Sequence, residues 1–176
     1  MMQKKSGLLI FILFPLFFSS GAIASKKNKN QIQKLSGVVE KCHDGDTCRV
    51  AVNDKILKIR FSGIDTPELS QKYGKDAQKF TESKLRGQNV DLECEGKSYD
   101  RLTCTVFLQG RNVNREIVLA GWAYDSFKYS KGEYAPDVAT AKSQRLGIWK
   151  DENLISPYCY RHKTSKHCRV SQSYMP

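Results

Sequence analysis

The sequence predicts a single α+β domain that is mainly β, and two observations lead to this class. Five short runs rich in apolar and β-branched residues are bounded by turn-forming residues, which is the pattern of short β-strands. Three other segments carry apolar residues at helical spacing, and they interrupt the strands. The chain shows no internal repeat and no second block of such elements.

The predicted strands are short and closely spaced. They span residues 37–42, 47–52, 55–61, 89–94 and 102–108. A tight turn at residues 43–46 joins the first two strands, and Asn53 and Asp54 form a hairpin turn before the third. Five short strands interrupted by helices are typical of a small barrel of the oligonucleotide-binding (OB) type.

Three helices are expected between and after the strands. They span residues 73–85, 112–120 and 137–146. Gly87 ends the first helix and Gly121 ends the second, because glycine readily adopts the left-handed conformation that follows a helix. Asp137 is expected to cap the third helix.

The first 24 residues have the pattern of a signal peptide. Lys4 and Lys5 precede an apolar run over residues 7–18, and Ala22 and Ala24 have the spacing of a cleavage site. An uncleaved anchor is the alternative, although the run is shorter than the roughly 20 apolar residues of a bilayer span. Cleavage would leave 152 residues with no stable membrane span, exported to the periplasm or secreted.

The remaining chain is strongly basic. Removing Lys4 and Lys5 lowers the formal net charge from +11 to +9. Residues 25–35 are polar and basic without a hydrophobic period, which predicts a flexible arm ahead of a domain over residues 36–150 and a tail over residues 151–176. Such a charge favours polyanions, including nucleic acid, anionic lipid and polysaccharide.

Six cysteines follow the expected cleavage site, which indicates a disulfide framework in an exported protein. They are Cys42, Cys48, Cys94, Cys104, Cys159 and Cys168. Hairpin register sets the first two opposite each other, and likewise the middle two. We expect the last two to pair as well. Zinc bound by Cys159, His162, His167 and Cys168 is the alternative for the tail.

Two acidic clusters carry the ligand chemistry. Asp46 follows Asp44 and Gly45 in the first turn, and Asp65 precedes Thr66 and a proline. Two carboxylates and a backbone carbonyl near Thr66 form an oxygen-only site suited to Ca²⁺. Taken alone, the first cluster is more often the pattern of a solvated hairpin turn.

The basic and acidic residues around these clusters suggest hydrolysis of a phosphodiester. Glu68 lies two residues after Thr66 and is placed to activate a water as a general base. Arg60 and Arg101 are suited to bidentate binding of a phosphate and of the charge that grows on it.

The order of these motifs resembles the staphylococcal nuclease (thermonuclease) family over residues 36–149. DGDT is followed by R-x-x-x-I-D-T-P-E, then Y-x-R, then N-x-x-x-V-x-x-G-W-A. The resemblance implies a five-stranded barrel with three helices and Ca²⁺-dependent endonuclease activity on DNA and RNA. It assigns Asp46, Asp65 and the Thr66 carbonyl to the metal, and Glu68 to the base.

The remaining roles also follow from the resemblance. Arg60 and Arg101 would bind phosphate, and Tyr99 would line the nucleotide pocket. Asp100 stands where the family usually has glycine, and it raises the question of whether an acid neutralises Arg101. Phe127 aligns with a pocket tyrosine, with Tyr129 two residues later; either ring could stack on a base.

Two other functions remain open at this stage. An OB-type barrel can bind nucleic acid without cutting it, and a basic surface protein would also use disulfides. The complete set of base and arginines favours an enzyme. We expect a monomer that takes DNA and RNA as substrates.

Overall fold

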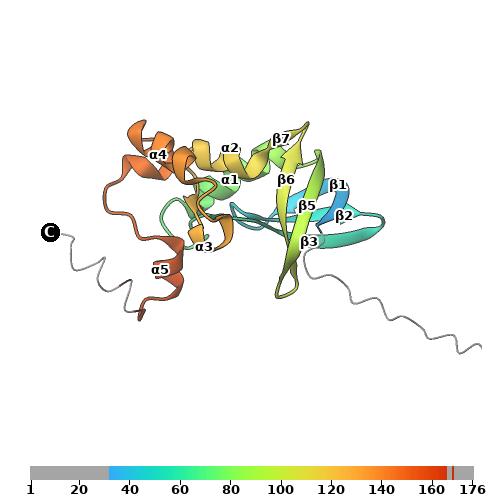
Figure 1. The fold of residues 1–176 in the computed structure, drawn as a ribbon, viewed down its shortest axis with the longest axis horizontal. Coiled ribbons are helices and arrows are strands. Elements are labelled where there is room, and N and C mark those ends of the chain that lie inside the picture. The colour runs from blue at the N-terminus through green and yellow to red at the C-terminus, as the bar shows by residue number, and fades with distance from the viewer. Residues whose placement is uncertain (1–31, 166–167, 169–176) are drawn as a thin grey trace, which may run out of the picture.

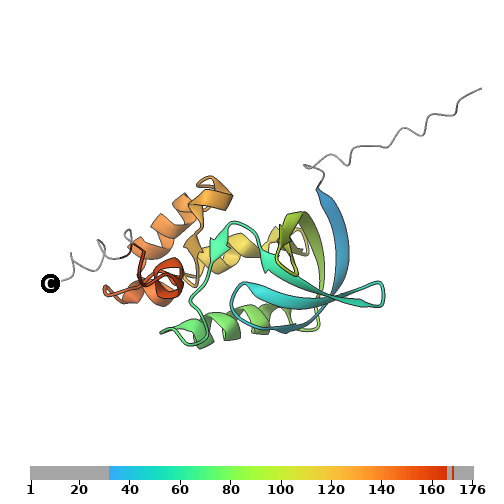
Figure 2. The same cartoon turned by 90° about the horizontal axis from the view of Figure 1, so that it is seen from below.

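The barrel is built from five strands whose pairing returns to its starting strand. The computed structural model describes residues 32–165 and Cys168. The barrel strands are β1 (Gln33–Cys42), β2 (Thr47–Val52), β3 (Lys55–Phe61), β5 (Asn89–Ser98) and β6 (Arg101–Leu108). They pair antiparallel in the order β3-β2-β1-β5-β6, and a parallel β3–β6 pairing closes the ring (Figures 1 and 2). The predicted OB-type α+β fold is therefore confirmed.

Three short strands complete the sheets. They are β4 (Ile64–Asp65), β7 (Arg111–Asn112) and β8 (Tyr124–Asp125). β4 pairs with β8, so that Asp65 lies opposite Tyr124, and β7 extends the edge of β6. The β4–β8 pair ties the chain after the third barrel strand to the segment after the second long helix.

The described part of the chain contains five α-helices, of which three have seven or more residues. They are α1 (Gly74–Leu85), α2 (Val113–Leu119), α3 (Phe127–Ser130), α4 (Ala135–Ser143) and α5 (Pro157–Arg161), with a 3₁₀ helix η1 at Gly147–Lys150. The three longer helices, α1, α2 and α4, match the three predicted ones. The expected cap at Asp137 is wrong: α4 begins at Ala135, and Asp137 lies in its first turn, where it binds Arg115.

Three strands are longer than their sequence pattern predicted: β5 continues to Ser98, β6 begins at Arg101, and β1 has the largest extension at its start. β1 begins at Gln33 instead of residue 37, and residues 33–35 pair with Cys94, Glu93 and Leu92 of β5. The last residues assigned to the basic arm therefore belong to the barrel wall. Alternation of polar and apolar side chains is weak in this segment, which is why the strand start was not visible in the sequence.

The core fills the barrel and continues under α2. Val39, Val50, Ile59 and Phe61 of the first three strands are fully buried, each worth roughly 1.5–3 kcal/mol relative to an exposed position. Buried Asn114 of α2 accepts from the Val106 amide (3.0 Å) and donates to the Ser62 carbonyl (2.8 Å). This side chain fastens α2 to the end of the barrel from which the site is built.

The three expected disulfides are present. Cys42 lies opposite Cys48 and Cys94 opposite Cys104, each pair 3.9 Å apart at Cα. Cys159 is bonded to Cys168 in the tail. Their thiols are therefore not available to zinc, and His167 lies outside the described residues.

The predicted signal peptide and most of the basic arm also lie outside the described residues. Among the helices that residues 32–165 form, none is long and apolar enough to cross a bilayer.

Candidate functional site

An open cavity of about 710 Å³ lies where the β4 segment, the β5–β6 hairpin and α5 meet. Eight of the nine residues predicted for catalysis, metal or substrate binding line it. They are Asp46, Arg60, Asp65, Thr66, Glu68, Tyr99, Arg101 and Tyr129. Phe127 is not among the lining residues.

The turn between β1 and β2 presents Asp46 from the barrel. The Asp46 amide donates to a carboxylate oxygen of Asp44 (3.0 Å), and the Cys42–Cys48 disulfide closes the turn at its base. Gly45 lies so close to Thr66 that an added Cβ would be 2.8 Å from the Thr66 hydroxyl. Only glycine therefore allows the turn to pack directly on the β4 segment.

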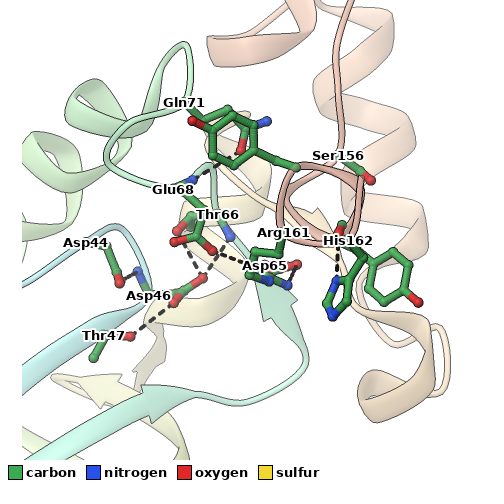
Figure 3. A network of polar contacts seen from close by, with 12 residues as sticks. Asp44, Asp46, Thr47, Asp65, Thr66, Glu68, Gln71, Ser156, Arg161 and His162 are labelled. Atoms are coloured by element: carbon green, nitrogen blue, oxygen red, sulfur yellow. Dashed lines mark hydrogen bonds and ion pairs between the residues drawn. The ribbon is translucent and has the colours of Figure 1, made fainter. Parts of the chain in front are cut away.

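The segment after β4 presents Asp65 and Thr66 beside this turn. The Thr66 amide and hydroxyl both donate to Asp46 Oδ2, at 2.8 and 2.9 Å (Figure 3). Pro67 directs the chain out of β4, because the residue before proline is held in an extended conformation. These contacts bring the two predicted carboxylate ligands together although they lie 19 residues apart in the chain.

Arg60 lies between the two acids and is held rigidly. Its guanidinium donates to the carbonyls of Phe61 and Ile64, both at 2.8 Å. It also pairs with Asp46 (3.1 Å) and Asp65 (3.0 Å), and its side chain is only 18% exposed. Because backbone carbonyls as well as carboxylates bind the guanidinium, its orientation at the cavity wall does not depend on the two acids alone.

The acids of the site are crowded and partly desolvated. Burial, followed by the charge of Asp46, raises the pKa of Asp44 to about 7. Burial also raises the pKa of Asp65, although hydrogen bonds and charge from Arg161 and Arg60 oppose the shift. Crowded carboxylates of this kind are stabilised when a cation binds among them.

The donor set is compatible with a hard divalent cation. Within residues 32–165 no three Asp, Glu, His or Cys side chains form a ready-made ligand cluster. Asp46 and Asp65 supply carboxylates, and the Thr66 carbonyl lies in the same segment. All these donors are oxygens, the type that Ca²⁺ and Mg²⁺ prefer, and both ions complete their shells with water.

Glu68 and Arg161 form the outer side of the site. Arg161 Nη1 donates to Glu68 Oε1 (2.5 Å) and to Asp65 Oδ1 (3.2 Å), and its Nη2 donates to Asp65 Oδ2 (2.8 Å) (Figure 3). Burial disfavours the charged guanidinium, but the bonds to Asp65 and Glu68 outweigh this effect and raise the pKa of Arg161. Sequence reasoning missed Arg161, because it belongs to the tail and to none of the recognised motifs.

Arg101 enters the cavity from the β5–β6 hairpin. Tyr99 adopts a left-handed conformation (φ 59°) in the turn just before it. Asp100 pairs with Lys58 on β3, and this hydrogen bond is the main cause that lowers the pKa of the Asp100 carboxyl. Among the described residues Asp100 is therefore engaged with Lys58, and Arg101 forms no ion pair.

The aromatic residues form an exposed rim. Tyr99 is 94% exposed and Tyr129 is 64% exposed, and both line the cavity. Phe127, at the start of α3, is also exposed but lies outside the lining. An added Cβ at Gly132 would be 3.1 Å from the Phe127 ring, which places Phe127 against the turn after α3.

Fold and cavity together define an OB-type barrel protein whose site combines carboxylates with guanidinium groups. A family model described as "Staphylococcal nuclease homologue" matches residues 58–151. The chain belongs to the staphylococcal nuclease family.

Several relatives carry nuclease names. An "Uncharacterized endonuclease" from Haemophilus influenzae is 31% identical over 167 residues, covering 93% of this chain and 88% of the relative. Another "Uncharacterized endonuclease", from Escherichia coli O157:H7, is 31% identical over 132 residues, which is 73% of this chain and 86% of the relative. A "Micrococcal nuclease" from Shigella flexneri is 31% identical over 138 residues, 71% of this chain and 79% of the relative.

Proposed function

We propose that this protein is an exported, calcium-dependent endonuclease that hydrolyses phosphodiester bonds in DNA and RNA. The observation that carries the proposal is that the carboxylates of Glu68, Asp46 and Asp65 and two arginines, Arg60 and Arg101, converge on one open cavity. Family membership and the nuclease names of relatives support the same activity.

The side chains that line the cavity have different roles in the proposed hydrolysis. Glu68 accepts a proton from the attacking water, because its carboxylate lies at the cavity beside Asp65. Arg60 and Arg101 approach from β3 and from the β5–β6 hairpin, and they bind the phosphate oxygens on which charge grows. Tyr99 and Tyr129 supply rings on which neighbouring bases stack.

Asp46, Asp65 and the Thr66 carbonyl would hold the cation. A bound Ca²⁺ supplies charge that stabilises the phosphate oxygens and lowers the pKa of bound water. Asp46 is fixed for this role by its bonds from Thr66, and Asp65 is fixed by β4.

Export fits the covalent structure of the chain. Three disulfides persist in an oxidising compartment, such as the periplasm or the outside of the cell. The apolar segment over residues 7–18 supports a cleaved signal peptide as the route. We expect the mature protein to act as a monomer.

One activity assay tests the proposal. The disulfide-intact chain from residue 25 is incubated with a plasmid and with an RNA transcript, with calcium or with excess chelator. Internal cuts in both substrates that require calcium are the expected result.

A barrel that binds nucleic acid without cutting it is the competing outcome. Retarded mobility of uncut DNA, the same with calcium and with chelator, would contradict the proposed enzyme. Glu68→Gln is the matched control against a contaminating nuclease, because it should remove cleavage and leave purification behaviour unchanged.

A further inference from the structure

The Glu68 carboxylate has one polar partner among the described residues, and that partner is Arg161. Glu68 lies on the loop after β4 and its side chain is 35% exposed. Its backbone amide donates to the Gln71 side chain (3.2 Å), whereas within residues 32–165 its carboxylate is bound by Arg161 alone. The backbone of the loop is therefore fixed locally, while the position of the carboxylate depends on the tail.

Arg161 connects Glu68 to a proposed cation ligand. One nitrogen, Nη1, donates to both Glu68 and Asp65, so the two carboxylates must lie close together. Two such negative groups repel each other unless a cation lies between them. The guanidinium suits this position because its planar fork of five donors can bridge two carboxylates, which a lysine ammonium does less well.

The helix that carries Arg161 is anchored independently of this bridge. Ser156 caps α5 by accepting from the Cys159 amide (3.2 Å), and Cys159 is bonded to buried Cys168. Tyr160 Oη donates to the Ser70 carbonyl (3.2 Å). Gln71 on the Glu68 loop donates to the carbonyl just before the helix, that of Ile155.

We propose that Arg161 is a positioning residue of the nuclease site, which holds the Glu68 carboxylate beside Asp65 where it can activate the attacking water. The inference rests on the proposed function, because it assigns Arg161 a task through Glu68. Arg161 does not itself touch the reacting atoms. The disulfide-bonded tail is thus part of the catalytic machinery, in addition to the barrel.

A double-mutant cycle with Glu68 tests this role. Turnover is measured at saturating calcium for the wild type, Arg161→Gln, Glu68→Gln and the double variant, with melting temperature as a check of folding. Arg161→Gln should lower kcat at least about tenfold and change KM by less than about twofold. In the Glu68→Gln background it should change kcat by less than about twofold, because the group it positions is already inactive.

Two further variants separate positioning from a general loss of charge or structure. Arg161→Lys should restore part of the lost kcat, since it keeps the charge but not the fork. Arg145→Gln removes a guanidinium that lies outside the cavity and pairs with Glu152 and a backbone carbonyl, and it should leave kcat unchanged. A crystal structure of Arg161→Gln should show the Glu68 carboxylate turned away from Asp65.

Three results would overturn the inference. The same loss of kcat in both backgrounds would mean that Arg161 acts independently of Glu68. A loss of kcat that is seen below saturating calcium and is absent at saturation would mean that Arg161 acts through Asp65, and an unmoved Glu68 carboxylate would remove the positioning role. If Glu68→Gln alone were as active as the wild type, the failure would lie in the proposed function, because the base itself would be misassigned.

Discussion

At the scale of single residues, the site depends on side chains that share a cavity but differ in how firmly they are held. Arg60 is enclosed by two carbonyls and two carboxylates, whereas Arg101 projects from a hairpin turn without an ion pair among the described residues. Glu68 is intermediate, since its loop is fixed and its carboxylate has one partner. These differences set the expected consequences of substitution.

Replacing Glu68 by glutamine should lower turnover by roughly 10²–10⁴-fold, the usual contribution of a general base. The amide keeps the size of the side chain, so nucleic-acid affinity should stay nearly unchanged. Turnover is measured by single-turnover cleavage and affinity by binding with calcium omitted. A variant within a few-fold of the wild type would remove Glu68 from the mechanism.

Arg101→Ala should damage cleavage far more than loss of the basic arm. Arg101 lines the cavity and would act on one phosphate, whereas the arm lysines over residues 26–29 add attraction that salt screens. Deleting residues 25–31 should mainly weaken binding as salt is raised. Binding and single-turnover rates across a salt series distinguish the two, and a deletion that abolished single-turnover cleavage would place the chemistry elsewhere.

Asp44 should make the cation-free protein less stable as pH rises. Its folded-state pKa of about 7 lies above its ordinary value of 3.8, so between these values the folded protein keeps a proton that the unfolded chain has lost. Stability contributed by that proton is present below about pH 4 and is lost as pH rises through 7. Asp44→Asn lacks this loss and should keep its contact with the Asp46 amide.

Melting temperatures in chelator check this effect. The two proteins should melt closer together at pH 4 than at pH 8, where Asp44→Asn should be the more stable. A difference that does not change with pH would contradict the raised pKa of Asp44.

At the scale of elements, each of the first two disulfides closes a segment that presents a site residue. Cys42–Cys48 lies at the base of the turn that carries Asp46, and Cys94–Cys104 lies in the hairpin that carries Arg101. Short loops such as these stabilise the fold by about 2–3 kcal/mol in the chain-entropy treatment. Their second effect is to restrict the conformations of the turn.

The joint replacement Cys42→Ser and Cys48→Ser separates these two effects. If the bridge holds Asp46 in its binding geometry, calcium affinity should fall while the melting temperature changes little. Calorimetric titration gives the affinity, and the joint replacement of Cys94 and Cys104 by serine serves as the matched control. Equal calcium affinity with a lowered melting temperature would mean that the disulfide stabilises the fold and has no effect on calcium binding.

At the scale of the whole molecule, the site is assembled from three parts: the barrel, the segment after β4 and the tail. A cation that binds Asp46 and Asp65 links the first two parts, so it should stabilise the folded state by mass action. Calcium should raise the melting temperature of the chelator-treated protein and restore cleavage, and zinc at the same free concentration should do so poorly because the donors are all oxygens. Better restoration by zinc would implicate His43, which precedes Asp44 in the turn between β1 and β2, or the tail histidines.

The sequence by itself determined the parts of the structure that depend on neighbours in the chain. Turn residues and apolar runs predicted the five barrel strands, and hairpin register set Cys42 opposite Cys48 and Cys94 opposite Cys104. The motifs, taken in their order along the chain, predicted eight of the residues that line the cavity. Each motif lies in one turn or short segment, so its residues are positioned by their neighbours in the chain. The starts of β1 and α4 were displaced by two to four residues, since pairing with β5 and packing outweigh local propensity there.

Only the tertiary structure decided which distant side chains meet. Arg161 reaches Glu68 across 93 residues of chain, and Asp100 binds Lys58 across 42. Tyr129 faces the cavity and Phe127 does not, although both rings were candidates. Contacts of this kind follow from how the tail and hairpin dock on the barrel, and docking depends on packing and charge between elements that no local pattern records.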